Sequence, residues 1–313
     1  MNSAIHTQNL SKRFGQTTAV DRMNLDVSEG AIYALVGPNG SGKTTTIKLL
    51  MNILRPTAGR AAVLSIDSRS FAGKAFERVG YVSENQEIPE WMTVAALLNY
   101  CRGFYPRWDR QLAEQLVRQL DLPLGRKLKH LSRGMRMKAS FASSLAYRPS
   151  LIVLDEPFTG LDPLVRDELI EGLLKRASEA TIFISSHDLA EIETFASHVG
   201  FLENGRLLFS EEMTALSNRF REVTVTLDRP AALAQELPRS WLRPQSADCV
   251  VRFIHSQFDG EASRREIAAV FPAARDISLD AMSLRSIFLA VAKSNRGNAS
   301  SAQNQAGTGR TAA

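Results

Sequence analysis

Residues 37–44 read Gly-Pro-Asn-Gly-Ser-Gly-Lys-Thr, and this stretch decides the fold of the chain. It matches the phosphate-binding pattern G-x-x-x-x-G-K-[ST] at every required position. The glycines let the backbone curl so that successive N–H groups point at phosphate oxygens, and the following helix presents its positive N-terminal end to the same anion. We therefore expect Lys43 to reach the β and γ phosphates of a nucleotide and the Thr44 hydroxyl to bind Mg²⁺.

The segments around this loop occur in the order that a phosphate site requires. Residues 31–36 (AIYALV) form an apolar run of strand length, and residues 44–51 have a helical pattern. Further apolar runs at 79–83, 151–154 and 181–185 are separated by helical stretches. Strands that alternate with helices predict a mainly parallel sheet with helices on its faces.

The rest of the chain divides into regions of different pattern. Leucines at helical spacing between about residues 90 and 148 predict a helical subdomain inserted into the sheet domain. An Asn204-Gly205 pair between two short apolar runs predicts a β-hairpin. Beyond the hairpin we expect strands at 222–227 and 248–253 and helices at 261–270 and 283–293, the last capped by Ser283. The predicted organisation is a first domain at 1–213, a small α+β domain at 214–293 and a disordered tail at 294–313.

Two adjacent acids follow the apolar run at 151–154. A buried strand that ends in an acid places Asp155 at the carboxyl edge of the sheet, beside the phosphate loop, where it can hold Mg²⁺. Glu156 comes next and can orient or deprotonate the attacking water. Taken alone, the two acids could cap the next helix or form a surface ion pair. The phosphate loop favours the catalytic interpretation.

Composition excludes several other classes of protein. Lys and Arg number 38 against 33 Asp and Glu, a net charge of +5 that is modest for a nucleic-acid binder. The cysteines, Cys101 and Cys249, lie far apart and lack metal-ligand spacing, so we expect two reduced thiols. The sequence shows no signal peptide and no run of ~20 apolar residues that could span a membrane. A membrane process would need another chain to cross the bilayer.

Four more motifs resemble those of the ATP-binding-cassette (ABC) family. Leu-Ser-Arg-Gly-Met at 131–135 resembles its signature motif, usually Leu-Ser-Gly-Gly-Gln, and Thr-Gly-Leu-Asp at 159–162 resembles the loop after its catalytic glutamate. His187, at the end of the run at 181–185, resembles the family's switch histidine, and Phe14 resembles the aromatic residue that stacks on adenine. With the phosphate loop, these motifs cover residues 1 to about 210 in the family's order.

The resemblance implies both a fold and a mechanism. The fold is an α/β P-loop NTPase cassette with a mainly parallel sheet core, an N-terminal antiparallel β part and an inserted helical subdomain, followed here by a small α+β domain. Two cassettes dimerise head to tail, so Ser132 and Gly134 would contact the γ-phosphate of ATP bound to the partner cassette. His187 would sense the γ-phosphate, and Asp162 would link the two sites.

The sequence departs from the family pattern at two places. Arg133 replaces the first glycine of the signature motif, and Met135 replaces its glutamine. The loop after the strand at 79–83 usually carries a glutamine that contacts Mg²⁺ and water. Here Glu84 stands at that position and Gln86 two residues later, so either residue could serve.

Together these arguments give one set of candidate residues for ATP and Mg²⁺. The candidate catalytic residues are Glu156, His187 and Lys43, and the candidate metal ligands are Thr44, Asp155 and Glu84. The residues expected to bind nucleotide are Phe14, Gly37, Pro38, Asn39, Gly40, Ser41, Gly42, Lys43, Thr44, Thr45, Glu84, Ser132, Gly134 and Asp162.

The resemblance also implies partners. Residues from about 215 to 293 resemble the C-terminal extension of exporter ATPases, so we expect a multi-span membrane permease and a second cassette, identical or different, at the cytoplasmic face of the cell membrane. The permease would dock between the loop at 84–90 and the helices after Thr93, and it would select the transported substrate.

Alternatives are a soluble ABC ATPase that acts on nucleic acid or ribosomes, and a metabolite kinase. The single cassette and the absence of interleaved aromatic residues in the basic run at 126–138 disfavour nucleic acid, and the signature motif disfavours a kinase.

Overall fold

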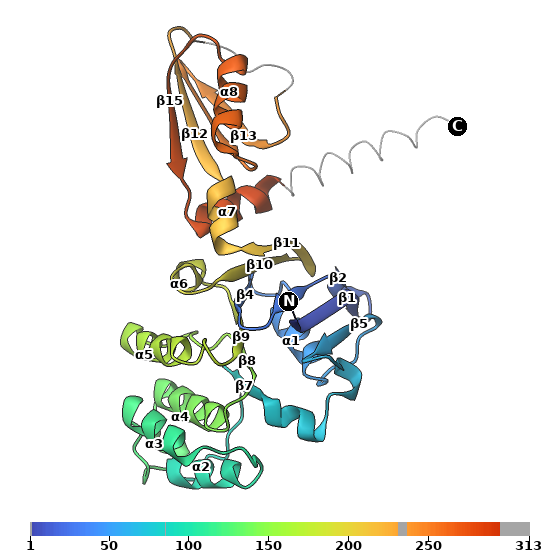
Figure 1. Cartoon of the computed structure of the whole chain (residues 1–313), viewed down its shortest axis with the longest axis vertical. Coiled ribbons are helices and arrows are strands. Elements are labelled where there is room, and N and C mark those ends of the chain that lie inside the picture. Colours follow the sequence, from blue (N-terminus) through green and yellow to red (C-terminus); the bar gives the residue numbers. More distant parts are fainter. Residues whose placement is uncertain (1, 85, 231–236, 295–313) are drawn as a thin grey trace, which may run out of the picture. The chain divides into compact units, whose positions relative to one another are not determined.

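The computed structural model describes residues 2–84, 86–230 and 237–294 (Figure 1). Backbone contacts divide the chain into one unit that ends at Ser210 and a second that begins at Glu211. Residues 295–313, most of the predicted tail, lie outside the described residues, and Ser294 is still helical. Among the described residues, no helix has both the length and the apolar character needed to cross a bilayer.

The first unit is built on a six-stranded sheet in the order β11-β10-β4-β9-β8-β7. Strand β4 pairs in parallel with β9 and β10, and β8 pairs in parallel with β7 and β9. Every residue of β8 and β9 is buried, which explains why these strands read as continuous apolar runs. The strands are β4 (Ile32–Val36), β7 (Val79–Ser83), β8 (Leu151–Asp155), β9 (Thr181–Ser186), β10 (His198–Glu203) and β11 (Arg206–Glu212). The predicted parallel sheet is therefore confirmed.

The predicted hairpin joins β10 to β11. Asn204 (φ 49°) and Gly205 (φ 78°) both adopt the left-handed conformation that a two-residue hairpin turn requires.

An antiparallel sheet forms the N-terminal part of the same unit. The long strand β1 (Ser3–Phe14) pairs with strands β2, β3 and β5, and β6 extends the sheet beyond β5. The shorter strands are β2 (Thr17–Met23), β3 (Asp26–Ser28), β5 (Ala58–Val63) and β6 (Ile66–Asp67). Helix α1 (Lys43–Leu50) buries Ile47, Leu49 and Leu50 in the core that this sheet shares with β4 and β9. The sheet thus supports the helix that follows the phosphate loop.

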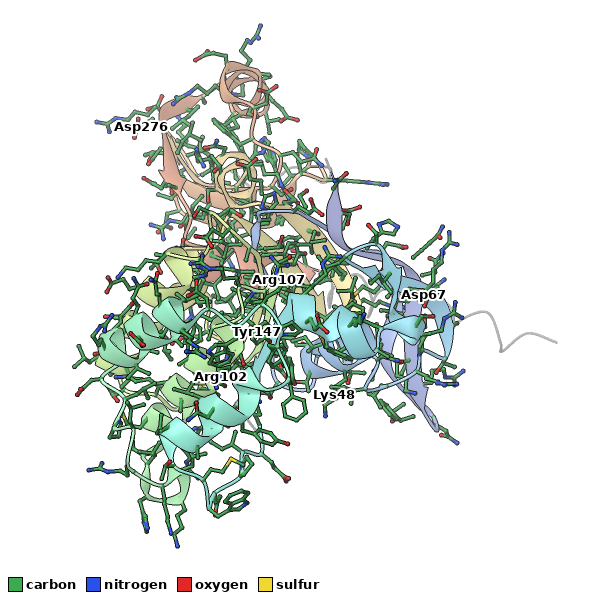
Figure 2. All side chains as sticks on the ribbon, turned by 60° about the horizontal axis from the view of Figure 1, so that its bottom comes forward. Lys48, Asp67, Arg102, Arg107, Tyr147 and Asp276 are labelled. Carbon is green, nitrogen blue, oxygen red and sulfur yellow. The ribbon has the colours of Figure 1, made fainter. Side chains whose placement is uncertain are left out.

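Three helices gather as the inserted helical subdomain (Figure 1). They are α2 (Val94–Arg102), α3 (Arg110–Gln119) and α4 (Arg133–Leu145). Each begins at a side-chain cap, namely Thr93, Asp109 and Ser132. Tyr147, labelled in Figure 2, is 2% exposed and stacks on Tyr105 with 3.7 Å between ring centroids. Helices α5 (Pro163–Leu174) and α6 (Leu189–Glu193) follow β8 and β9, and short 3-10 turns lie at Ser68–Ser70, Gly73–Arg78 and Leu128–His130.

The second unit is a four-stranded antiparallel sheet, in the order β13-β14-β12-β15, with helices. Its core contains Trp241, Phe253 and Phe271, whose rings stack. The elements are α7 (Met213–Arg219), β12 (Arg221–Leu227), β13 (Trp241–Ala247), β14 (Val250–His255), α8 (Gly260–Val270) and β15 (Ala274–Ala281), with residues 284–294 helical. Ser283 caps the last helix, because its hydroxyl accepts a hydrogen bond from the N–H of Ser286.

Two details of the expected second domain were wrong or missing. The strand predicted at 248–253 begins at Val250, because Asp248 adopts a left-handed turn conformation (φ 52°). The sequence reasoning also missed β13 and β15, which pair with β14 and β12.

Candidate active site

The phosphate loop leaves β4 and enters α1 at a point where backbone atoms crowd it. A Cβ atom on Gly37 would lie 2.2 Å from the Leu202 carbonyl oxygen, and one on Gly42 (φ +109°) would lie 2.3 Å from the Ala19 carbonyl oxygen. Only glycine fits at either position. The hydroxyl of Ser41 is buried and has no hydrogen-bond partner among the residues that the structure describes, so it is available to a bound ligand.

The lysine of the loop is buried, with 5% of its surface exposed. Its ammonium donates hydrogen bonds to the carbonyl oxygens of Gly37 (2.7 Å) and Pro38 (3.2 Å). The Lys43 ammonium also lies 3.1 Å from a carboxylate oxygen of Glu156. The loop therefore curls around its own lysine, and the lysine neutralises the acid that directly follows β8.

A hydroxyl and a carboxylate meet at the carboxyl edge of the sheet. The Thr44 hydroxyl donates to a carboxylate oxygen of Asp155 at 3.0 Å. The Ser185 hydroxyl, at the end of β9, donates to the same oxygen at 2.7 Å. Hydroxyl and carboxylate oxygens are ligands that Mg²⁺ accepts, usually with nucleotide phosphates and water. The described residues contain no cluster of three or more acids, histidines or cysteines able to hold a metal.

Glu156 links the loop to His187. It has a left-handed backbone (φ 52°) directly after β8, which turns its side chain toward the loop. One carboxylate oxygen contacts Lys43, and the other lies 2.8 Å from Nδ1 of His187 and 3.2 Å from the Thr159 hydroxyl. The backbone N–H of Glu156 donates to the Ser185 hydroxyl at 3.0 Å. A carboxylate so placed can accept a proton from water beside a bound phosphate.

These residues surround a pocket of about 280 Å³. Its lining combines loop backbone, one lysine and two acids, a chemistry that binds an anion and activates water. The lining residues are Ala19, Asn39, Gly40, Ser41, Gly42, Lys43, Thr44, Thr45, Glu84 and Glu156. Sequence reasoning missed Ala19 and Ser185. Ser185 is a polar residue at the end of the apolar run at 181–185, and this polarity is the sequence feature that could have identified it as a site residue.

Glu84 and Gln86 occupy different surroundings. Glu84 lines the nucleotide pocket, and its N–H donates to the Asp155 carbonyl oxygen at 3.0 Å. Gln86 instead lines two neighbouring pockets that border α4. The geometry therefore favours Glu84 for contact with a bound metal or phosphate.

Eight of the predicted residues do not line this pocket. Gly37, Pro38, Asp155 and His187 contact residues that do line it, and the other four are Phe14, Ser132, Gly134 and Asp162. Phe14 is 47% exposed, with the Lys12 ammonium 5.0 Å from its ring centroid. Ser132 and Asp162 cap α4 and α5 by accepting hydrogen bonds from Met135 (3.2 Å) and Val165 (3.0 Å). Gly134 packs against Val165, because a Cβ atom there would lie 3.2 Å from the valine side chain.

Comparison with known proteins places the first unit in a large family. A family model described as ABC transporter matches residues 20–159. The bacitracin transport ATP-binding protein BcrA of Enterococcus faecalis is 33% identical over 229 residues, which cover 72% of this chain and 74% of that protein. The lantibiotic transport ATP-binding protein SrtF of Streptococcus pyogenes is 32% identical over 218 residues, covering 67% of this chain and 92% of that protein.

Solved structures share the fold of the first unit. The ATP-binding subunit of an ABC transporter superposes with a TM-score of 0.62 at 26% identity, covering 67% of this chain and 90% of that one. A dimeric ATP-binding cassette bound to ADP and phosphate superposes with a TM-score of 0.59 at 22% identity, covering 67% of this chain and 98% of that one.

Proposed function

Because the chain belongs to the ABC transporter family of ATP-binding proteins, we propose that it is the ATP-hydrolysing subunit of an exporter and powers a separate membrane permease. One observation carries the proposal. Lys43, Thr44, Asp155, Glu156 and His187, from three separate segments, meet at one edge of the parallel sheet. This is the set that binding and hydrolysing ATP requires.

Each residue has a task in this reaction. Lys43 leaves Glu156 to bind the β and γ phosphates, which frees the Glu156 carboxylate to take a proton from the attacking water. His187, held 2.8 Å from Glu156, orients that carboxylate and donates to the γ-phosphate. Thr44 and Asp155 would hold Mg²⁺, and Glu84 lies where it can reach the metal's water. The ion would neutralise phosphate charge in the transition state.

A second cassette would complete the site. Ser132, Gly134 and Asp162 lie at or near the first turns of α4 and α5 and away from this chain's own pocket. The N-terminus of α4 carries partial positive charge, which suits a phosphate presented by another chain. We infer a head-to-tail dimer, identical or mixed, and one related fold has been solved as a dimer.

The permease would dock on the helical subdomain. Five large side chains in this region could anchor a partner, and of these Trp91 (70% exposed), Tyr100 (53%) and Phe104 (62%) present aromatic surface to solvent. Met92 is buried, and Tyr105 stacks on Tyr147, so these two pack inside the subdomain instead. Exposed aromatic side chains are common anchors of protein interfaces.

The relatives favour export over the alternatives. Those compared above are named for the transport of bacitracin or a lantibiotic. None of these names points to a soluble ATPase that acts on nucleic acid or ribosomes. We therefore place the chain at the cytoplasmic face of the membrane, held by its permease.

Membrane fractionation tests the proposal. Expressed with its permease, the chain should pellet with membranes and resist a high-salt wash, whereas expressed alone it should stay in the supernatant. Direct attachment to anionic lipid through scattered basic residues would be removed by salt. Salt-resistant membrane binding without any partner would contradict docking on a permease.

A further inference from the structure

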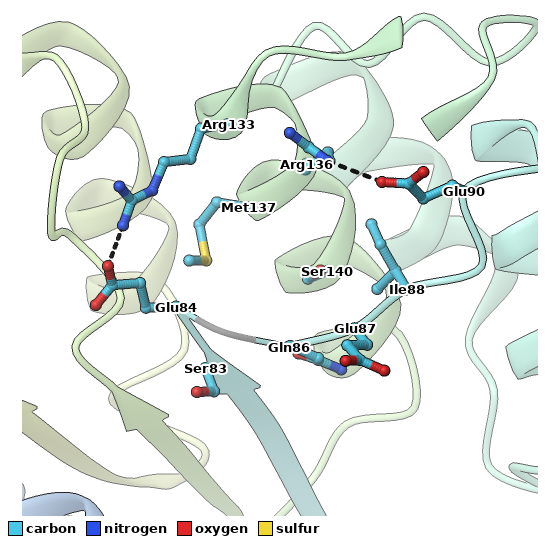
Figure 3. A pocket seen from close by; sticks show the side chains of 10 residues that line it. All are labelled: Ser83, Glu84, Gln86, Glu87, Ile88, Glu90, Arg133, Arg136, Met137 and Ser140. Atoms are coloured by element: carbon cyan, nitrogen blue, oxygen red, sulfur yellow. Dashed lines mark hydrogen bonds and ion pairs between the residues drawn. The ribbon is translucent and has the colours of Figure 1, made fainter. Parts of the chain in front are cut away.

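The two departures from the family pattern are in contact with each other. The Arg133 guanidinium forms an ion pair with the Glu84 carboxylate, although the two residues are 49 positions apart in the sequence (Figure 3). Arg133 stands where the signature motif usually has its first glycine, and Glu84 is one of the two candidates for the position where a glutamine is expected after β7.

Glu84 belongs to two pockets, whereas Arg133 belongs to one. Glu84 lines the nucleotide pocket together with Lys43 and Glu156. It also lines a pocket of about 760 Å³ between residues 83–90 and the first turns of α4, where Arg133 lies. Arg133 therefore contacts the carboxylate from the side away from the nucleotide.

Arg133 is held from a second direction. A Cβ atom added to Gly160 would lie 2.6 Å from a terminal nitrogen of the Arg133 guanidinium. Gly160 has a left-handed backbone (φ +67°), and it belongs to the loop that follows Glu156. The guanidinium is thus packed against this loop while it pairs with Glu84.

The charges around the nucleotide pocket determine how the Arg133–Glu84 ion pair would affect ATP binding. ATP must enter beside three carboxylates, Glu84, Asp155 and Glu156, and Lys43 neutralises one of them. An unpaired Glu84 carboxylate would repel the phosphates, most strongly before a metal is bound.

We propose that Arg133 is a positioning residue for Glu84. Its guanidinium neutralises the carboxylate and holds it at the wall of the nucleotide pocket, so that Glu84 can face the metal and γ-phosphate without repelling ATP. The inference rests on the proposed function, because it concerns the same pocket.

A double-mutant cycle tests the pair. Full-length wild type, Glu84→Gln, Arg133→Gln and the double variant would be titrated with a fluorescent ATP analogue, once with Mg²⁺ and once with EDTA. Arg133→Gln should weaken binding in EDTA by roughly two- to fivefold, the range of a partly exposed ion pair. It should weaken binding less when Mg²⁺ is present. In the Glu84→Gln background the same change should have no measurable effect, because no carboxylate remains to be neutralised.

Arg136→Gln is the matched control. Arg136 lies on the same helix, 3.5 Å from Glu90, and neither residue lines the nucleotide pocket. This variant should bind the analogue like wild type in both buffers, and Arg133→Lys should recover part of the affinity that Arg133→Gln loses in EDTA.

Two results would overturn the proposal, and they can be told apart. If Arg133→Gln weakens binding equally with and without Glu84, Arg133 acts on phosphate directly or through the fold. If the wild-type protein does not bind the analogue even with Mg²⁺, the proposed ATPase function is wrong, and the proposed role of the Arg133–Glu84 pair is then wrong as well.

Discussion

The Lys43 ammonium lies 3.1 Å from a carboxylate oxygen of Glu156, so the residue that should bind phosphate is paired with the residue that should activate water. Both side chains are largely buried, with 5% and 14% of their surfaces exposed. We therefore expect ATP to replace Glu156 as the partner of the lysine before hydrolysis begins.

Replacing Glu156 by Gln should separate binding from hydrolysis. The amide keeps the shape of the side chain but cannot accept the proton of water, so phosphate release should fall by roughly 10²- to 10⁴-fold. ATP should still bind, and a nucleotide-bound dimer should accumulate in light-scattering measurements. Glu114→Gln, an exposed acid on α3, is the control and should hydrolyse ATP normally. Near-normal turnover in Glu156→Gln would refute its role as the base.

Replacing Lys43 by Gln should act on binding itself. Loss of a charge-assisted hydrogen bond to phosphate weakens affinity by roughly 10- to 100-fold, which isothermal titration with ATP and Mg²⁺ would measure. Lys48, on the same helix and labelled in Figure 2, does not line the pocket, so Lys48→Gln should bind as wild type does. Equal affinity in the two variants would show that Lys43 does not contact phosphate.

Replacing His187 by Ala should slow hydrolysis while ATP affinity stays within a few fold. The imidazole lies 2.8 Å from Glu156, and a lost hydrogen bond to a charged group reduces the rate by roughly 10- to 100-fold. Single-turnover measurements separate this step from product release. His6→Ala, which removes a surface histidine paired with Asp26, should turn over at the wild-type rate. An unchanged rate in His187→Ala would remove the histidine from the mechanism.

The sequence predicted the parts of the fold in which each strand is buried on both faces. Strands β8 and β9 are continuous apolar runs because helices and neighbouring strands cover them completely. Strand β15 is only partly buried and has no regular alternation, and its position depends on pairing with β12, for example of Leu279 with Val223. Such a strand cannot be predicted from its own residues, because its partner supplies the stabilisation.

The candidate site also has parts that the sequence predicts and parts that it does not. The phosphate loop and the acids after β8 are local patterns whose chemistry needs a fixed spacing, so the sequence shows them directly. The contacts of Ser185 with Asp155 and of Arg133 with Glu84 join residues 30 and 49 positions apart. These contacts form only when the strands have assembled, so no spacing of residues within a short stretch of sequence predicts them.

The two candidates for the loop after β7 can be distinguished by one pair of variants. Glu84 lines the nucleotide pocket and Gln86 does not, so Gln86→Ala should keep ATP hydrolysis close to wild type. Glu84→Ala should lower hydrolysis at limiting Mg²⁺ and change the Mg²⁺ concentration needed for half-maximal rate, because it removes a carboxylate near the metal. The reverse pattern, with hydrolysis lost only in Gln86→Ala, would mean that Gln86 holds this position.

The second unit should lose stability as the pH falls, because of His255. This imidazole is 1% exposed, and its ring centroid lies 5.8 Å from that of Phe258 and 6.4 Å from that of Trp241. Burial lowers the pKa of His255 below its usual 6.5, and the nearby Glu266 carboxylate only partly offsets this. Below pH 6.5 the unfolded chain therefore binds a proton that the folded unit excludes, so folding stability is complete above that pH and decreases below it.

The effect can be measured through Trp241, which is 4% exposed in the same unit. With Trp91 and Trp108 replaced by Phe, its fluorescence would report the urea unfolding of this unit between pH 7.5 and 5.0. We expect stability to fall by at most about 1.4 kcal/mol per pH unit from this one group. His255→Gln should flatten this dependence, whereas His130→Gln, at an exposed position, should keep it. A dependence that persists unchanged in His255→Gln would assign it to other groups.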